Sequence, residues 1–184
     1  MSSKLCLISL LLMSAAAAEK VPVIAKITKT NQVVTRAGSQ YAQVVPVSIR
    51  EGMLYRATDG STLRKFEDRA QLTRPGKSYE IDYRSQMILE VPAQGVEDYK
   101  GVNPLRESTV AAIRCKVIQI ATDTEACVSV EYGLMLRQEK SYPGDYGTIL
   151  HVVTELSEVK LHSEPDSNLF TLPEGFRRPI NTEP

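Results

Sequence analysis

The sequence predicts a mainly β domain with a mostly antiparallel sheet. Segments in which apolar and polar residues alternate recur along most of the chain, and this period of two is typical of strands with one buried face. Turn signals such as Asp59-Gly60 and Pro75-Gly76 separate the segments. Hardly any stretch has the 3.6-residue spacing of an amphipathic helix, so little helix is expected. A strongly curved sheet, a half-open barrel or a sandwich satisfies this pattern.

The first half of the chain is expected to form successive strands. The opening segment, 21–34, contains Lys26 and Lys29 and suits the edge of a sheet. Asp59-Gly60 predicts a type I′ turn, because Asp-Gly tolerates the two positive φ angles that this turn needs. The further strands expected in this half are residues 44–55, 61–67, 78–83 and 87–91.

The second half begins with a long connection, 92–107, which is rich in Gly and Pro and is expected to hold one helical turn near 96–100. A strand pair turning at Thr122-Asp123 follows, and its second strand is expected to run from Val128 to Arg137. A turn is expected at 141–145. The last long strand starts near Gly147, and its apolar positions switch parity, which predicts a bulge near Ser157-Glu158. Phe170, Leu172 and Phe176 then form an expected apolar clasp.

The N-terminus indicates export. Residues 1–18 combine Lys4, an apolar run and a small-residue end, which is the pattern of a cleaved signal peptide. The run is shorter than the roughly 20 residues needed to span a bilayer. No cysteine lies at the cleavage region to serve as a lipid attachment site. We therefore expect a periplasmic or secreted soluble protein, with one β-rich domain at 19–176, a flexible tail at 177–184 and no integral membrane segment.

The charge balance excludes one class of partner. The chain has 22 basic and 22 acidic residues, so it offers no long-range attraction to nucleic acid or to an anionic membrane. The local basic group Arg177-Arg178 has no interleaved aromatic residues. Nucleic acid is not expected as a partner.

Two cysteines remain after the signal, Cys115 and Cys127. In an oxidising compartment, such a pair suggests a disulfide. A hairpin turning at Thr122-Asp123 would set Val117 against Val128 and Ile113 against Tyr132. That register puts the cysteines on opposite faces, where they could not bond without a bulge or a one-residue slip. The sequence leaves the bond open.

No catalytic, cofactor or metal site is expected. His151 and His162 are the only histidines, and neither belongs to a G-x-S-x-G, Cys/His or zinc signature. The carboxylate pairs 67–68, 97–98 and 164/166 are close in sequence. Adjacent residues on a strand point to opposite faces, so these are expected to be solvated turn charges. Phosphate-binding glycine loops are absent as well.

Three segments carry a family resemblance: 55–61 (YRATDGS), 130–134 (VEYGL) and 161–176 (LHSEPDSNLFTLPEGF). They resemble motifs of a group of uncharacterised secreted bacterial proteins, similar to the outer-membrane lipoprotein carrier class with the LolA-like fold. The resemblance covers residues 53–176. It implies a single strongly curved antiparallel sheet, an unclosed β-barrel whose concave side can hold acyl chains.

The function expected from this resemblance is that of a non-catalytic secreted or periplasmic protein. It would bind a lipid, a lipoprotein segment or another apolar ligand on the concave face of the sheet. The alternative is an envelope protein-protein interaction module without a small ligand, docking through an exposed sheet edge or the 92–107 connection. A third interpretation, a hydrolase built on His151 or His162, lacks a recognisable motif.

Overall fold

The computed structural model describes residues 21–37, 41–92, 103–144 and 148–179. They form one unclosed antiparallel sheet of 11 strands, in the order β6-β5-β4-β3-β2-β1-β11-β10-β9-β8-β7. The strands are β1 (Val23–Ala37), β2 (Tyr41–Arg56), β3 (Thr62–Phe66), β4 (Arg69–Arg74), β5 (Lys77–Asp82), β6 (Met87–Val91), β7 (Arg106–Val110), β8 (Ile113–Ala121), β9 (Thr124–Ser129), β10 (Leu134–Pro143) and β11 (Ile149–Leu161). The helix in the described part is the short 3-10 turn η2 (Ser167–Phe170). The expected fold class is confirmed.

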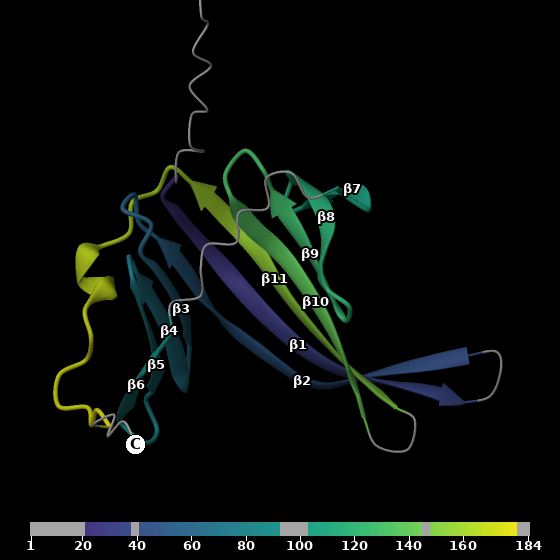
Figure 1. Cartoon of the computed structure of the whole chain (residues 1–184), viewed down its shortest axis with the longest axis horizontal. Coiled ribbons are helices and arrows are strands. Elements are labelled where there is room, and N and C mark those ends of the chain that lie inside the picture. Colours follow the sequence, from purple (N-terminus) through teal and green to yellow (C-terminus); the bar gives the residue numbers. More distant parts are fainter. Residues whose placement is uncertain (1–20, 38–40, 93–102, 145–147, 180–184) are drawn as a thin grey trace, which may run out of the picture.

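The first and last strands meet at the centre of the sheet, where β1 pairs with β11 (Figure 1). The chain runs outward from β1 to the edge strand β6, and later returns from the opposite edge strand β7 to β11. The prediction that the first strand lies at an edge is therefore wrong. Lys26 marks the solvent face of a central strand, because its neighbours Ala25 and Ile27 are buried while its Nζ pairs with Glu158 of β11.

All five strands expected before residue 92 occur near their expected positions, and the opening one extends to Ala37. The sequence reading missed β4. Its only apolar residues are Ala70 and Leu72, and both are buried. The hairpin between β2 and β3 is present, but its turn is not type I′. Gly60 has a positive φ of 85° while Asp59 does not, and the Asp59 carboxylate accepts a hydrogen bond from the Ser61 amide.

Two boundaries in the second half also differ from expectation. The expected continuous strand 128–137 is broken, because β9 ends at Ser129 and β10 starts at Leu134. Gly133, with φ of 53°, lies in the intervening turn. Further on, β10 runs through Pro143, so residues 141–143 belong to this strand and not to the turn expected at 141–145. The predicted helical turn at 96–100 lies outside the described residues.

The bulge predicted near Ser157-Glu158 is confirmed. The pairing of β1 with β11 shifts register between Ile24 and Lys26, opposite this point, and Glu158 has a positive φ of 48°. The extra residue explains why the apolar positions of β11 switch parity along the strand.

The sheet buries apolar side chains on both faces, in different regions. Leu54 and Tyr55 are adjacent on β2 and therefore point to opposite faces; Leu54 belongs to one buried cluster and Tyr55 packs against another. We call the face of Leu54 the inner face. Its buried residues are Val23, Ala25, Ile27, Leu54, Val110, Cys115, Val117, Cys127, Leu134, Leu136 and Leu156. Because these come from seven strands and pack as one cluster, the sheet curls around this face.

The opposite face is covered at β3 to β6 by the C-terminal segment, as the clasp prediction expected (Figure 1). Phe170 is buried there, and the ring of Phe176 meets that of Tyr83 edge-on with centroids 6.0 Å apart. The chain stays attached beyond this point. The amide of Arg177 donates to Gln86 and its carbonyl accepts from Ile88, so the expected loose tail does not start at Arg177.

The two remaining cysteines are joined in a disulfide across β8 and β9. The register predicted for this hairpin is wrong, because Val117 pairs with Cys127 rather than with Val128. A register shift between Gln119 and Ala121 supplies the one-residue slip. It brings Cys127 onto the inner face beside Cys115, whereas a regular hairpin would separate them.

Arg56 ties together three parts of the chain at one end of the sheet. Its side chain is 7% exposed and donates to the carbonyl oxygens of Val21, Tyr132 and Gly133 at 2.8–2.9 Å. Burial lowers the pKa of this guanidinium, since the charge is removed from water. The contacts join the start of β1, the end of β2 and the turn before β10.

We predict that Arg56→Met lowers the free energy of unfolding by about 3 kcal/mol, because it leaves three carbonyls without their donor. Urea unfolding measures the loss. The free energy of unfolding of Arg56→Lys should lie between those of the unaltered protein and Arg56→Met, since an ammonium lacks the planar fork of donors. The control is Arg114→Met at an exposed position of β8. Equal losses at both positions would refute the role given to Arg56.

We predict that replacing both Cys115 and Cys127 by Ala costs about 2–3 kcal/mol, because the bond closes a short loop, a separation of 12 residues, in the unfolded chain. The oxidised protein should lose the same amount on reduction, while the double variant should be insensitive to reductant. Thiol labelling of the native protein provides the check. Full labelling without prior reduction would contradict the bond.

Candidate binding site

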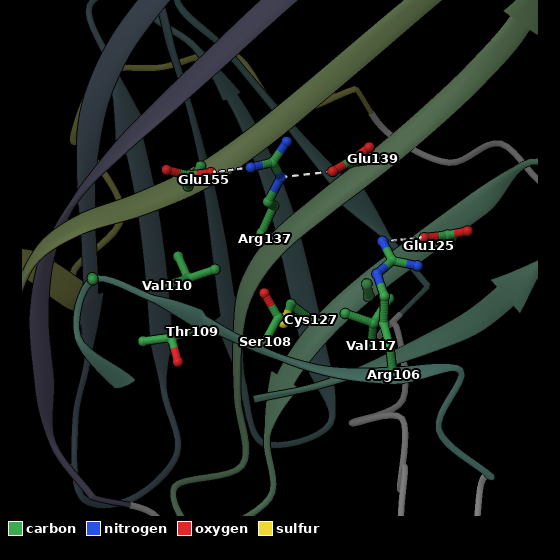
Figure 2. Close-up of a pocket in the computed structure, with 12 residues that line it drawn as sticks. Arg106, Ser108, Thr109, Val110, Val117, Glu125, Cys127, Arg137, Glu139 and Glu155 are labelled. Carbon is green, nitrogen blue, oxygen red and sulfur yellow. Dashed lines mark hydrogen bonds and ion pairs between the residues drawn. The ribbon is translucent and has the colours of Figure 1, made fainter. Parts of the chain in front are cut away.

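A pocket of about 400 Å³ opens beside the inner face, between the edge strand β7 and strands β8 to β11. Its apolar wall contains Val110, Val117 and Cys127, all members of the inner cluster. Figure 2 shows Ser108, Thr109 and Val110 of β7 on one side, and Arg137, Glu139 and Glu155 of β10 and β11 on the other. The remaining lining residues are Arg106, Ala111, Glu125 and Ala126.

The polar side of the pocket is made of paired charges. Arg137 Nε lies 2.7 Å from Glu139 Oε1, and its Nη1 donates to Glu155 at 2.9 Å. Arg106 Nη2 donates to Glu125 at 3.0 Å, across from β7 to β9 (Figure 2). These groups are partly exposed, so each pair contributes little to stability and can exchange partners with a bound polar group. The lining of the pocket is therefore mostly polar and carries both signs of charge, with a small apolar part at Val110, Val117 and Cys127.

Strand pairing places these charges together. Arg137 is opposite both Cys127 of β9 and Glu155 of β11, and Glu139 is opposite Glu125. A bulge between Met135 and Arg137 shifts the register of β10 against β9. Because of this bulge, Arg137 lines the pocket although it directly follows the buried Leu136 on the same strand.

The two histidines lie apart. His151 is near the start of β11, and its Nε2 is 3.4 Å from Oε2 of the pocket-lining Glu139. His162 follows the end of β11, is exposed and has a positive φ of 57°. Cys115 and Cys127 are joined to each other in the disulfide. In the ranges that the structure describes, no three His, Cys, Asp or Glu side chains gather as a metal ion would require.

The carboxylate pairs singled out in the sequence have local partners. Asp68 lies near Arg50, Arg69 and Arg84. Asp166 accepts from the Asn168 amide at the start of η2. Residues 97–98 are outside the described ranges.

The three resemblance motifs converge at one end of the sheet. Arg56 of the first motif binds Tyr132 and Gly133 of the second. Thr58 of the first motif donates to the Glu164 carboxylate of the third. A second hollow of about 360 Å³ lies between the first and third motifs, from Ala57 to Phe170. The motifs therefore hold the sheet together rather than line the larger pocket.

Sequence reasoning did not single out Arg106, Glu125, Arg137, Glu139 or Glu155. The available signal was Arg137 and Glu139 at alternate positions directly after the apolar Leu134 and Leu136. Such a pattern indicates a strand whose one face passes from a core to a polar cavity. Partners from β7, β9 and β11 depend on bulged registers, and those are not readable from one strand.

Comparison with known proteins shows likeness in structure alone. No protein-family model and no curated protein matches the sequence. An uncharacterized conserved protein from Thermus thermophilus aligns with 86% of this chain and 90% of its own, at a TM-score of 0.53 and 10% identity. This likeness shows a shared fold. The LolA superfamily protein NE2245 from Nitrosomonas europaea aligns with 83% of this chain and 91% of its own, at a TM-score of 0.40 and 10% identity.

Within the described residues, no helix has the length and hydropathy needed to cross a membrane.

Proposed function

We propose that this protein is a non-catalytic envelope protein that binds an amphiphilic, lipid-like ligand in the pocket beside the inner face. The observation that carries the proposal is that Val110 and Val117 of the inner cluster and two sets of paired charges line the same, mostly polar pocket. An amphiphile matches this lining, because its chain can pack on Val110 and Val117 while its polar end meets the paired charges. Pockets for small ligands are typically of this size, with a few polar groups that fix orientation.

The rest of the inner face limits how such a ligand can bind. Residues of seven strands already fill its centre, and Val23 and Leu136 are fully buried there. A chain laid across the whole sheet would have to displace this core, at several kcal/mol for each large side chain exposed. A ligand confined to the side pocket leaves the core intact, which favours a short acyl chain or the end of a longer one.

The expected envelope location is consistent with two features. Residues 1–18 read as an export signal. The disulfide between Cys115 and Cys127 is a bond that persists in an oxidising compartment. Both features support a role outside the cytosol, where free amphiphiles and lipoprotein segments are available as ligands.

The test uses a substitution that fills the pocket and leaves the buried core residues unchanged. Ser108 is exposed and lines the pocket, so Ser108→Trp should occupy the space a chain would use. We predict that the unaltered protein binds the apolar dye N-phenyl-1-naphthylamine and that fatty acids displace it. Ser108→Trp should weaken binding by about tenfold or more, a loss of at least about 1.4 kcal/mol.

The matched control is Glu107→Trp, because this neighbour is exposed, lies on the same strand and does not line the pocket. It should bind the dye as the unaltered protein does. Native mass spectrometry of protein purified from its own host gives a second readout. The proposal fails if no amphiphile copurifies and the dye does not bind, or if both tryptophan variants bind equally well.

A second candidate is docking of another protein at a sheet edge. Among the described strands, β3 pairs with β2 only from Gly52 to Arg56, which leaves β2 unpaired on that side before Gly52. This free edge contains Pro46, and the pairing with β1 is bulged between Asn31 and Gln32. Proline and bulges disfavour the addition of a further strand, so the pocket is the better supported site.

A further inference from the structure

The charges that line the pocket do not balance. The lining contains three glutamates, Glu125, Glu139 and Glu155, and two arginines, Arg106 and Arg137. Figure 2 shows Arg137 between Glu139 and Glu155, with Arg106 against Glu125. Among the described residues, the lining contains no other charged side chain. Three negative charges against two positive ones leave one negative charge in excess where a ligand would lie.

The charged residues of the same strands that do not line the pocket point elsewhere. Lys116 precedes the pocket-lining Val117, and adjacent residues of a strand point to opposite faces. Lys140 follows Glu139 in the same way, and its Nζ lies over the Tyr142 ring at 4.7 Å from the centroid. Glu158 and Lys160 lie at or beyond the bulge of β11. The full set outside the lining is Glu107, Arg114, Lys116, Lys140, Glu158 and Lys160.

Two of the three carboxylates are direct neighbours. Glu125 of β9 and Glu139 of β10 are opposite each other in the sheet. Side chains at such positions start only about 5 Å apart, and like charges there destabilise the pairing. Glu139 already attracts a second basic group, since His151 Nε2 is 3.4 Å from its Oε2. A cation between Glu125 and Glu139 would relieve the repulsion between them.

The two arginines are already engaged with these carboxylates. Arg137 contacts Glu139 at 2.7 Å and Glu155 at 2.9 Å, and Arg106 donates to Glu125 at 3.0 Å. An anionic polar end would have to share an arginine with a glutamate, and it would bring a fourth negative charge into the pocket. An ammonium can add to the glutamates without breaking a pair, because an ionised carboxylate offers about four lone-pair sites.

We propose that the pocket selects amphiphiles whose polar end carries an amino group over fatty-acid anions of the same chain length. The ammonium lies between Glu125 and Glu139, and the chain packs on Val110 and Val117. This inference rests on the proposed binding of an amphiphile in the pocket and adds the charge of its polar end. A fatty acid still binds through its chain, but less tightly.

The size of the preference follows from how wet the site is. The side chains of Glu125, Glu139 and Glu155 are 35%, 31% and 41% exposed. Water therefore weakens each interaction with a bound charge to about 1 kcal/mol or less. An ammonium is attracted where a carboxylate is repelled, so the two effects add in the comparison. We expect a preference of about fivefold or more.

The test compares amphiphiles that share one chain and differ in the polar end. Dodecylamine, dodecanol and dodecanoate compete with N-phenyl-1-naphthylamine for the full purified protein at about pH 8, each below its micelle-forming concentration. At this pH an alkylamine is protonated and a carboxylic acid is ionised. Dodecylamine should displace the dye at a concentration about fivefold or more below that of dodecanoate, with dodecanol between them. About 0.5 M salt should reduce the difference, because salt screens exposed charges.

The variants remove carboxylates from the pocket. Glu139→Gln should reduce the preference to about twofold or less, because two positive charges then face two negative ones. If this variant does not bind the dye, Glu125→Gln carries the same expectation. The double variant Glu125→Gln/Glu139→Gln should favour dodecanoate, since both arginines then face Glu155 alone. Dye binding by each variant shows that its pocket persists.

The matched control is Glu107→Gln, which makes the same change of charge at an exposed neighbour of Arg106 that does not line the pocket. It should keep the preference of the unaltered protein. A preference that falls as much in Glu107→Gln as in Glu139→Gln would overturn the inference, because selectivity would then follow the charge of the whole protein.

The remaining outcomes separate this inference from the proposed function. Equal displacement by dodecylamine and dodecanoate, or stronger displacement by dodecanoate, would overturn the preference and leave amphiphile binding in place. If neither the dye nor any of the three amphiphiles binds, the proposed function and this inference fail together.

Discussion

The buried guanidinium of Arg56 is the constraint on which the rest of the structure depends. A curled sheet whose first and last strands meet at its centre must fix the ends of those strands, and Arg56 does so with carbonyls from Val21, Tyr132 and Gly133. Since no carboxylate is among these partners, the charge is stabilised only while all of them stay in place. This explains why the motif segments around residues 56, 132 and 164 converge on one end of the sheet. They are architectural, and the proposed binding pocket lies elsewhere.

The position of the proposed pocket follows from how the sheet distributes its apolar residues. Where the sheet curls, its inner face is filled by its own side chains. Between β7 and strands β8 to β11, the curl leaves a mostly polar pocket in which paired charges lie beside a small apolar part. Beyond Gly52 of β2 and Lys140 of β10, only β2, β1, β11 and β10 are paired in the described part of the sheet. There, Val47 and Ile49 are each 62% exposed. The core and the pocket are thus two regions of one sheet, and the curvature of the sheet relates them.

Local patterns allowed much of the fold to be predicted, and long-range pairing explains what was missed. The parity switch at Ser157-Glu158 correctly predicted a bulge, because a bulge changes the pattern of its own strand. The bulge near Gln119 was not predicted, since it leaves no such trace, and Cys127 was therefore assigned to the wrong face. Lys26 suggested an edge strand, although lysine identifies only a solvated face. The pocket charges escaped notice because Arg106 and Arg137 belong to strands far apart in the sequence.

Backbone amide hydrogen exchange, read by mass spectrometry, tests most directly whether the sheet is centred on the meeting of its two ends. The account predicts that amides of β1 from Val23 to Asn31 and of β11 from Val152 to Glu155 exchange slowest, because both segments are paired on each side. The edge strands β6 and β7 should exchange faster. Exchange in β1 as fast as in β6 and β7 would contradict a central position for the first strand.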